Sequence, residues 1–151
     1  MPLSNIGNRN GFVLLVEDNQ DDEELAVMAL QSAGLRLPIV VARDGAEAID
    51  RLVGSGVSGS SGRPLIVLLD LKLPKVDGFG VLKRIRETEG LRSLPVVVLT
   101  SSDTDEDINR SYALGVNSYV RKPVEFESYK STIGALGQYW LTLNEFPRDV
   151  S

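Results

Sequence analysis

The chain has 151 residues and a formal net charge of −5, which fits one acidic domain and gives no electrostatic footprint for direct nucleic-acid binding. It contains no cysteine and no histidine, which excludes disulfides, a thiolate nucleophile, a histidine-ligated zinc site and a phosphohistidine relay within the chain. No apolar run approaches the roughly 20 residues that span a bilayer, and the first residues do not resemble a secretion signal, so we expect a cytoplasmic protein without membrane contact.

Along the chain, short apolar runs that predict strands alternate with segments that predict helices. Strands are expected at 12–17, 37–42, 65–70, 95–100 and 117–121. Helices are expected at 20–33, 45–53, 78–89, 104–115 and 125–144. This alternation predicts an α/β fold in which a five-stranded, doubly wound parallel sheet is flanked by five helices.

Two segments fall outside this repeat. Residues 1–11 are expected to be disordered or extended, so the domain covers 12–151, with an apolar C-terminal extension from about 138. Residues 54–63 are rich in Gly and Ser, which predicts a flexible surface loop inserted before the third strand.

Four of the predicted strands end at residues suited to phosphoryl chemistry. These residues are Glu17 and Asp18 after the first strand, Asp70 after the third, Thr100 after the fourth and Lys122 after the fifth. In parallel sheets, ligands bind at the carboxyl ends of the strands. We therefore expect three acids, a hydroxyl and an ammonium to converge on one edge of the sheet.

The three acids would repel one another unless a cation compensates their charge. Oxygen ligands without His or Cys suit Mg²⁺, and the main-chain carbonyl of Lys72 is a further candidate ligand. A carboxylate such as Asp70 can attack phosphorus and form an aspartyl phosphate. The Lys122 ammonium and the Thr100 hydroxyl would then neutralise and bind the phosphoryl oxygens.

Four sequence motifs surround these residues: VEDNQDD, LLDLKLPKVDG, LTSSD and Tyr119 followed by Arg121, Lys122 and Pro123. Together they resemble the receiver domain of two-component response regulators over nearly the whole chain. The resemblance implies the flavodoxin-like strand order 2-1-3-4-5. It also implies a cis peptide bond between Lys122 and Pro123.

The resemblance further implies a role for each matched residue in accepting phosphate from a sensor histidine kinase. The implied roles are phosphoacceptor (Asp70), Mg²⁺ ligands (Glu17, Asp18, Asp70 and the Lys72 carbonyl), phosphoryl-sensing residues (Thr100 and Lys122) and aromatic switch (Tyr119). Phosphorylation would draw the Thr100 hydroxyl inward and let the Tyr119 ring turn in behind it. This would change the surface formed by the helices expected at 104–115 and 125–144 and the strand expected at 117–121. Simple packing is the alternative for Tyr119.

Lys72 stands at a variable position of the family, two residues after the phosphoacceptor. A long cation there would screen the phosphoryl group from water, which predicts slow loss of phosphate. A solvated loop lysine without this effect is the alternative.

The helix expected at 125–144 carries an apolar seam, a row of apolar residues spaced three or four apart, that continues past the expected end of the sheet. A helix of about 20 residues extends about 30 Å, whereas a strand of five or six residues covers about 20 Å. The overhanging turns would present an apolar partner or dimer surface made of Tyr139, Trp140, Leu141, Leu143 and Phe146. In the alternative, this tail folds back over its own domain.

The inserted loop and the apolar ending look like those of single-domain regulators that accompany bacterial phytochromes. That likeness implies a red-light-sensing histidine kinase as partner, and a C-terminal tail that forms a homodimer or docks the kinase.

We therefore expect a stand-alone response regulator that signals through phosphorylation-dependent protein contacts and catalyses only reactions of its own aspartate. Two alternatives remain. A phosphohydrolase is disfavoured because Lys72 stands where such enzymes carry a second aspartate. The other is a phosphorylation-independent scaffold or a phosphate sink in a relay.

Overall fold

The fold is a parallel sheet with helices on both faces. A computed structural model describes residues 11–53 and 62–148. Within these residues the sheet has the order β2-β1-β3-β4-β5, and all neighbouring strands pair in parallel. The strands are β1 (Gly11–Val16), β2 (Ile39–Ala42), β3 (Arg63–Leu69), β4 (Val96–Thr100) and β5 (Ser118–Arg121). The predicted α/β class and the flavodoxin-like strand order are confirmed.

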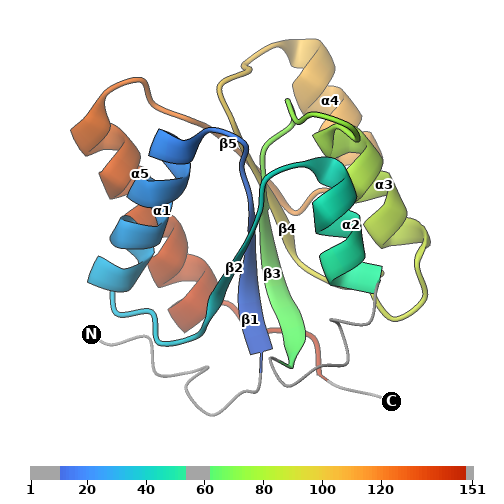
Figure 1. The fold of residues 1–151 in the computed structure, drawn as a ribbon, viewed down its shortest axis with the longest axis horizontal. Coiled ribbons are helices and arrows are strands. Elements are labelled where there is room, and N and C mark those ends of the chain that lie inside the picture. Colours follow the sequence, from blue (N-terminus) through green and yellow to red (C-terminus); the bar gives the residue numbers. More distant parts are fainter. Residues whose placement is uncertain (1–10, 54–61, 149–151) are drawn as a thin grey trace.

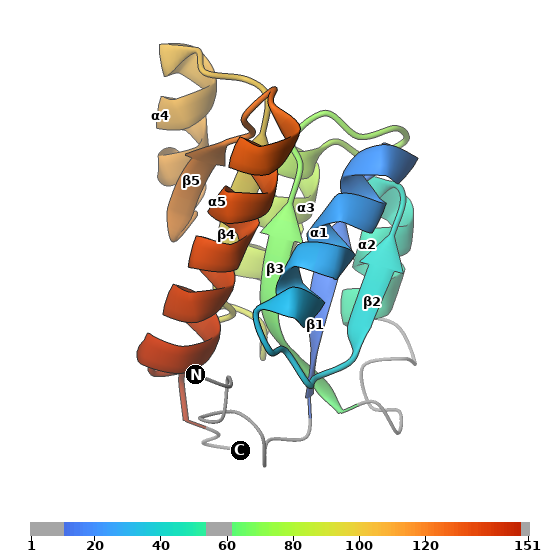
Figure 2. The same cartoon turned by 90° about the vertical axis from the view of Figure 1, so that its left-hand side faces the viewer.

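The helices form one layer on each face of the sheet. They are α1 (Gln20–Ser32), α2 (Gly45–Val53), α3 (Gly78–Glu87), α4 (Asp105–Ala113) and α5 (Phe126–Gln138). Figure 1 shows α1 and α5 on one face and α2, α3 and α4 on the other. Figure 2 shows α1 and α5 side by side across the front of the sheet, where they pack against each other. The fold is therefore a doubly wound sandwich, as predicted.

Local side chains determine where three of the helices begin. Asn19, Asp77 and Thr104 are the caps of α1, α3 and α4, and each side chain accepts a hydrogen bond from the backbone N–H three residues further on. The first turns of α1 and α4 are also acidic, which complements the positive end of the helix dipole. Both helices thus begin close to the carboxyl edge of the sheet.

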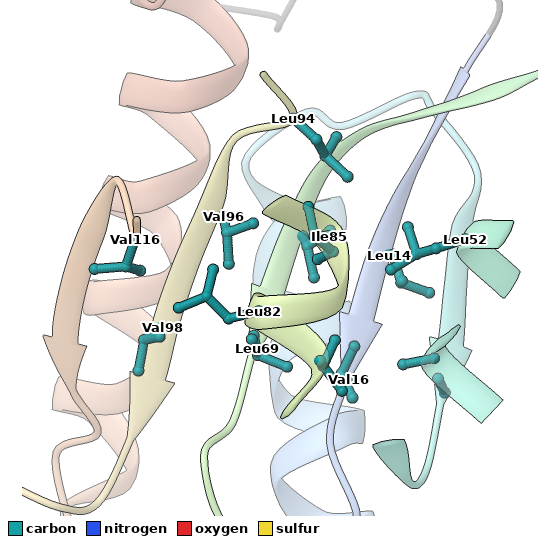
Figure 3. Close-up of a cluster of buried hydrophobic side chains, with 14 of the residues drawn as sticks. Leu14, Val16, Leu52, Leu69, Leu82, Ile85, Leu94, Val96, Val98 and Val116 are labelled. Carbon is teal, nitrogen blue, oxygen red and sulfur yellow. The ribbon is translucent and has the colours of Figure 1, made fainter. Parts of the chain in front are cut away.

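Two apolar layers bury the faces of the sheet. One lies under α2 and α3 and includes Leu14, Val16, Leu69, Leu82 and Ile85, which Figure 3 shows pointing toward one another. The other lies under α1 and α5 and includes Val13, Leu15, Leu30, Ile66 and Ile133. Because the central strands are covered on both sides, they read as continuous apolar runs rather than alternating ones.

The C-terminal helix continues beyond α5 as a π-helical turn, η2 (Tyr139–Leu143). Helical backbone therefore extends over residues 126–143, close to the predicted 125–144. The backbone then becomes extended at Asn144. The predicted long C-terminal helix is present, and its last turn is wider than an α-helical turn.

The expected exposed surface at this end is wrong for three of its five residues. Trp140, Leu141 and Phe146 are 9%, 2% and 5% exposed and belong to the apolar layer under α1 and α5. Tyr139 and Leu143 remain 50% and 71% exposed. Burying a large apolar side chain gains about 1.5–3 kcal/mol, which favours packing of the tail on its own domain. The fold-back alternative thus describes most of the tail.

Gly137 allows this close packing between α5 and α1. A Cβ atom at this position would lie 3.2 Å from Cδ2 of Leu30 on α1. The missing side chain lets the two helices approach, and Trp140 follows on the next turn.

Two expectations lie mostly outside the described residues. Of the N-terminal segment 1–11, only Gly11 is described, and it begins β1. Of the loop 54–63, only residues 62 and 63 are described, and Arg63 begins β3. In the two described stretches, no helix has the length and apolar character needed to cross a membrane.

Candidate functional site

Strand register brings two acidic residues together at the carboxyl edge of the sheet. Val16 of β1 pairs with Leu69 of β3, and Glu17 and Asp70 directly follow these residues. The Asp70 N–H donates to the Val16 carbonyl at 3.1 Å, which extends the pairing by one step. Glu17 is 2% exposed and Asp70 is 7% exposed. Both carboxylates are therefore held at the ends of adjacent strands and largely removed from water.

The three acids predicted from the sequence form one cluster. Glu17, Asp18 and Asp70 each offer a carboxylate oxygen, and these oxygens all lie within 4.8 Å of one another. Asp18 is exposed, whereas the other two are buried. Carboxylate oxygens with one side open to solvent fit a hard divalent cation that keeps several waters. The cluster can hold such a metal without any further side chain.

Lys72 contacts the phosphoacceptor candidate through its backbone. Its N–H lies 3.3 Å from Oδ1 of Asp70, and its side chain is exposed. The role of its carbonyl as a metal ligand stays a prediction.

The ammonium of Lys122 lies at the centre of the acidic site. Its Nζ is 2.7 Å from Oε1 of Glu17, 2.9 Å from Oδ2 of Asp22 and 3.1 Å from Oδ2 of Asp70. The side chain of Lys122 is only 9% exposed. A backbone hydrogen bond of 2.7 Å from Lys122 to the Thr100 carbonyl fixes its place beside β4. Lys122 follows β5 and therefore reaches the acids, which follow β1 and β3, from the other side of β4.

The charges in the cluster perturb each other. Burial raises the pKa of Glu17 to about 7, and the hydrogen bond and charge of Lys122 only partly oppose this. Burial alone would lower the pKa of Lys122, but the hydrogen bond to Glu17 and the charge of Asp70 outweigh it, so this pKa lies above its usual range. The carboxylates outnumber the ammonium, so this edge of the sheet has excess negative charge and would gain from a bound cation.

Thr100 and Tyr119 lie on the two strands beyond the acids. Val98 of β4 pairs with Leu69 of β3 and with Tyr119 of β5, which puts Thr100 one step beyond the level of Asp70. Thr100 is fully buried. Tyr119 is partly buried, and this burial raises the pKa of its hydroxyl. All predicted residues of the phosphoryl site therefore lie along one edge.

Close backbone packing holds the loop after Asp70 in place. The Gly78 N–H donates to the Leu71 carbonyl at 2.8 Å, and a Cβ atom at Gly78 would lie 2.4 Å from the Asp70 carbonyl oxygen. Only glycine allows α3 to begin this close to the strand end. The Asp-Gly pair at the start of α3 thus serves as both cap and packing contact.

The cis peptide bond expected between Lys122 and Pro123 is wrong. Within the described residues every peptide bond is trans. The trans form is the ordinary preference of X-Pro bonds, by about 0.5–1 kcal/mol. Lys122 makes its three ion pairs with this peptide in the trans form.

Several polar residues around the site lie outside the sequence predictions. Asp22 in the first turn of α1 binds Lys122, and the Tyr129 hydroxyl of α5 donates to the Asp22 carbonyl at 3.3 Å. On the other side, Ser102 donates through Oγ to Oδ2 of Asp107 at 2.6 Å. Asp22 belongs to the motif VEDNQDD, but its partner Lys122 is distant in the sequence. The sequence signal for this contact is therefore only an acid that stands one helical turn after the cap residue Asn19.

Comparisons with known proteins agree with this geometry. The family profile described as response regulator receiver domain matches residues 13–133. The probable methanogenesis regulatory protein FilR2 of Methanothrix harundinacea is 46% identical over 136 residues, which cover 90% of this chain and 87% of that protein.

Two solved structures of similar proteins share the fold. The Mn²⁺-bound form of response regulator Rcp1, a protein of Synechocystis sp., is 35% identical, with a TM-score of 0.84 over 91% of this chain and 99% of that one. The phosphorylated cyanobacterial phytochrome response regulator RcpA is 36% identical, with a TM-score of 0.81 over 92% of this chain and 99% of that one. With the family match, the strand order and the acid–lysine cluster, these likenesses show that the chain belongs to the response regulator receiver domain family.

Proposed function

We propose that this protein accepts a phosphoryl group on Asp70 from a sensor histidine kinase. The observation that carries the proposal is the buried Asp70 carboxylate, with the Lys122 ammonium 3.1 Å away and two further acids within reach of a shared cation. An Asp70 oxygen would attack phosphorus while the bond from phosphorus to the kinase histidine nitrogen breaks. Lys122 then neutralises a phosphoryl oxygen, and Thr100 donates its hydroxyl to another.

The metal we propose is Mg²⁺, held by Glu17, Asp18, Asp70 and the Lys72 carbonyl. The oxygen-only donor set supports this choice, and Rcp1 has been solved with Mn²⁺ bound. When bound, Mg²⁺ supplies positive charge that offsets the charge of the phosphoryl oxygens.

Signalling would then proceed through protein contacts rather than through turnover of a metabolite. Thr100 moves toward the phosphoryl group, and Tyr119 on the neighbouring strand changes its position with it. The surface of α4, β5 and α5 changes as a result. We place this signalling in the cytoplasm, with no direct contact to nucleic acid or membrane.

We further propose a phytochrome-type kinase as the phosphoryl donor. The likeness to RcpA, a phytochrome response regulator, supports this pathway. FilR2, whose name refers to methanogenesis, is also similar. Phosphotransfer from a panel of purified histidine kinases tests the assignment, and preferential transfer from a phytochrome kinase is expected.

We also propose that the protein forms a homodimer through the exposed part of its C-terminal surface. Tyr139 and Leu143 are large, apolar and exposed on η2, which supports this role. Sedimentation equilibrium of the wild type beside Leu143→Ser tests it. A dimer that the substitution weakens is expected. A wild-type monomer both before and after phosphorylation would contradict the proposal.

Intact-mass spectrometry after incubation with acetyl phosphate and Mg²⁺ tests the central proposal. We expect one base-labile phosphoryl group in the wild type and in Asp50→Asn, a matched control on the exposed face of α2. Asp70→Asn and a magnesium-free sample should gain none. A wild type that stays unmodified, both here and with the kinase panel, would favour a phosphorylation-independent scaffold.

A further inference from the structure

We propose that Asp22 is a positioning residue for phosphoryl transfer, which orients the Lys122 ammonium toward the phosphoacceptor. This inference deepens the proposed function and rests on phosphorylation of Asp70. Its starting point is the ion pair of 2.9 Å between Oδ2 of Asp22 and Nζ of Lys122. The two residues lie 100 positions apart in the sequence.

An ammonium has three N–H donors, and in this structure three carboxylates surround it. Two of them, Glu17 and Asp70, belong to the acid cluster that can hold a divalent cation, whereas Asp22 does not. A bound cation would compete with Lys122 for the oxygens of Glu17 and Asp70. A phosphoryl group would be bonded to Asp70 and would also change its contact with Lys122. Asp22 is therefore the carboxylate that can keep its contact with Lys122 throughout the reaction.

Asp22 is itself held from both sides. Its N–H donates to Oδ1 of the cap residue Asn19 at 2.9 Å, and its carbonyl accepts a hydrogen bond from the Tyr129 hydroxyl at 3.3 Å. Asn19 is tied in turn to the site, because its N–H donates to Oε2 of Glu17 at 3.2 Å. Tyr129 is only 3% exposed, so this support comes from the packed interface between α1 and α5.

Such support matters because a lysine side chain is long and flexible. Fixing its rotamers costs conformational entropy, and a misplaced catalytic charge loses much of its effect. The Asp22 carboxylate, anchored on a helix, holds the ammonium in place before the phosphoryl group arrives. Loss of this anchor should slow the transfer step itself more than it weakens donor binding.

Single-turnover phosphorylation by acetyl phosphate with saturating Mg²⁺ tests this role. The rate constant at saturating donor should fall about five- to tenfold in Asp22→Ala, with the half-saturating donor concentration unchanged. Asp22→Asn, which keeps an acceptor oxygen without the charge, should lose about two- to threefold. The matched control is Asp21→Ala, which removes an exposed acid from the same helical turn. It should stay within about twofold of the wild type.

A second readout follows the lysine directly. The ¹⁵N signal of the Lys122 ammonium should show slow proton exchange with water in the wild type and in Asp21→Ala, and faster exchange in Asp22→Ala. Three outcomes would each overturn the positioning role alone. They are phosphorylation and proton-exchange rates in Asp22→Ala that match the wild type, faster phosphorylation in Asp22→Ala, and phosphorylation that is slowed as much in Asp21→Ala as in Asp22→Ala. A wild type that gains no phosphoryl group would overturn the proposed function and this role with it.

Discussion

The hydroxyl of Tyr119 on β5 donates a hydrogen bond of 2.8 Å to the main-chain oxygen of Ser102. The Ser102 side chain in turn donates to Asp107 in the first turn of α4, and its N–H lies 3.5 Å from Oγ1 of Thr100. The loop between β4 and α4 thus connects the predicted phosphoryl-sensing hydroxyl, the predicted switch residue and the start of α4. A shift of Thr100 would disturb both Tyr119 and α4 through this loop.

Tyr119→Phe should remove the hydrogen bond to Ser102 and leave the aromatic packing in place. We expect a loss of about 1 kcal/mol in the free energy of unfolding, measured by urea denaturation. Phosphorylation of Asp70 should proceed as in the wild type, but the accompanying amide shifts over residues 101–107 should shrink. Tyr112→Phe on α4 is the control, because Tyr112 is 52% exposed. If phosphorylation shifts these amides as much in Tyr119→Phe as in the wild type, Tyr119 is only a packing residue.

Asp18→Asn should abolish stabilisation by Mg²⁺. A ligand at 100 times its dissociation constant stabilises the fold by about 2.7 kcal/mol, so the wild-type melting temperature should rise with Mg²⁺. The exposed Asp18 contributes one of three clustered carboxylate oxygens, and its loss removes a charged ligand. Thermal unfolding at constant ionic strength, with Asp21→Asn as control, checks this. A similar rise in wild type and Asp18→Asn would place the metal elsewhere.

The strand ends could be predicted from the sequence because buried parallel strands are continuous apolar runs that stop abruptly. Glu17, Asp70 and Thr100 each stand at such a stop, and sheet topology alone brings them to one edge. The order of the strands came from the resemblance to receivers, since apolar runs do not specify their neighbours. The structure confirms both.

The missed contacts depend on long-range geometry that no local pattern contains. Asp22 and Lys122 meet only because α1 and β5 reach the same edge of the sheet. The tail departs from the expected exposed surface for a related reason. Its apolar residues recur at helical spacing in the sequence, but whether Trp140 faces a partner or its own domain depends on how closely α5 approaches α1.

Lys72→Asn should shorten the lifetime of the phosphorylated protein. The Lys72 N–H lies 3.3 Å from Oδ1 of Asp70 and its side chain is exposed, so we expect that side chain to screen the phosphoryl group from water. Exchange for a shorter neutral side chain should raise the dephosphorylation rate about two- to fivefold, a barrier change of about 0.4–1 kcal/mol. Loss of the phosphoryl group after donor removal, followed by mass spectrometry, measures it. If the rate matches that of the wild type and of Lys83→Asn, an exposed control on α3, Lys72 is merely solvated.

Arg86 on α3 holds together two segments, residues 92–94 before β4 and residues 115–117 before β5. Its guanidinium donates to the carbonyls of Gly115 at 2.9 Å and Leu94 at 2.7 Å, and to Oδ1 of Asn117 at 2.9 Å. The same Asn117 oxygen accepts the Val96 N–H at 2.8 Å. Burial lowers the pKa of Arg86, and the oxygens that accept these hydrogen bonds are neutral carbonyl and amide oxygens rather than carboxylates. The residue thus fixes the starts of β4 and β5 on the side of the sheet away from the acids.

Arg86→Met should therefore destabilise the fold without affecting the chemistry of Asp70. Methionine keeps much of the apolar stem but removes the hydrogen bonds to Gly115, Leu94 and Asn117, at about 0.5–1.5 kcal/mol for each bond. We expect a total loss of about 2–4 kcal/mol in the free energy of unfolding. Urea denaturation followed by the fluorescence of the single tryptophan measures this loss. The control Arg84→Met, on the exposed face of the same helix, should cost less than about 0.5 kcal/mol. Equal losses of unfolding free energy in the two variants would mean that the hydrogen bonds of Arg86 add nothing to stability. A large loss in Arg86→Met with normal phosphorylation of Asp70 would show that Arg86 stabilises this end of the sheet independently of the site at the other end.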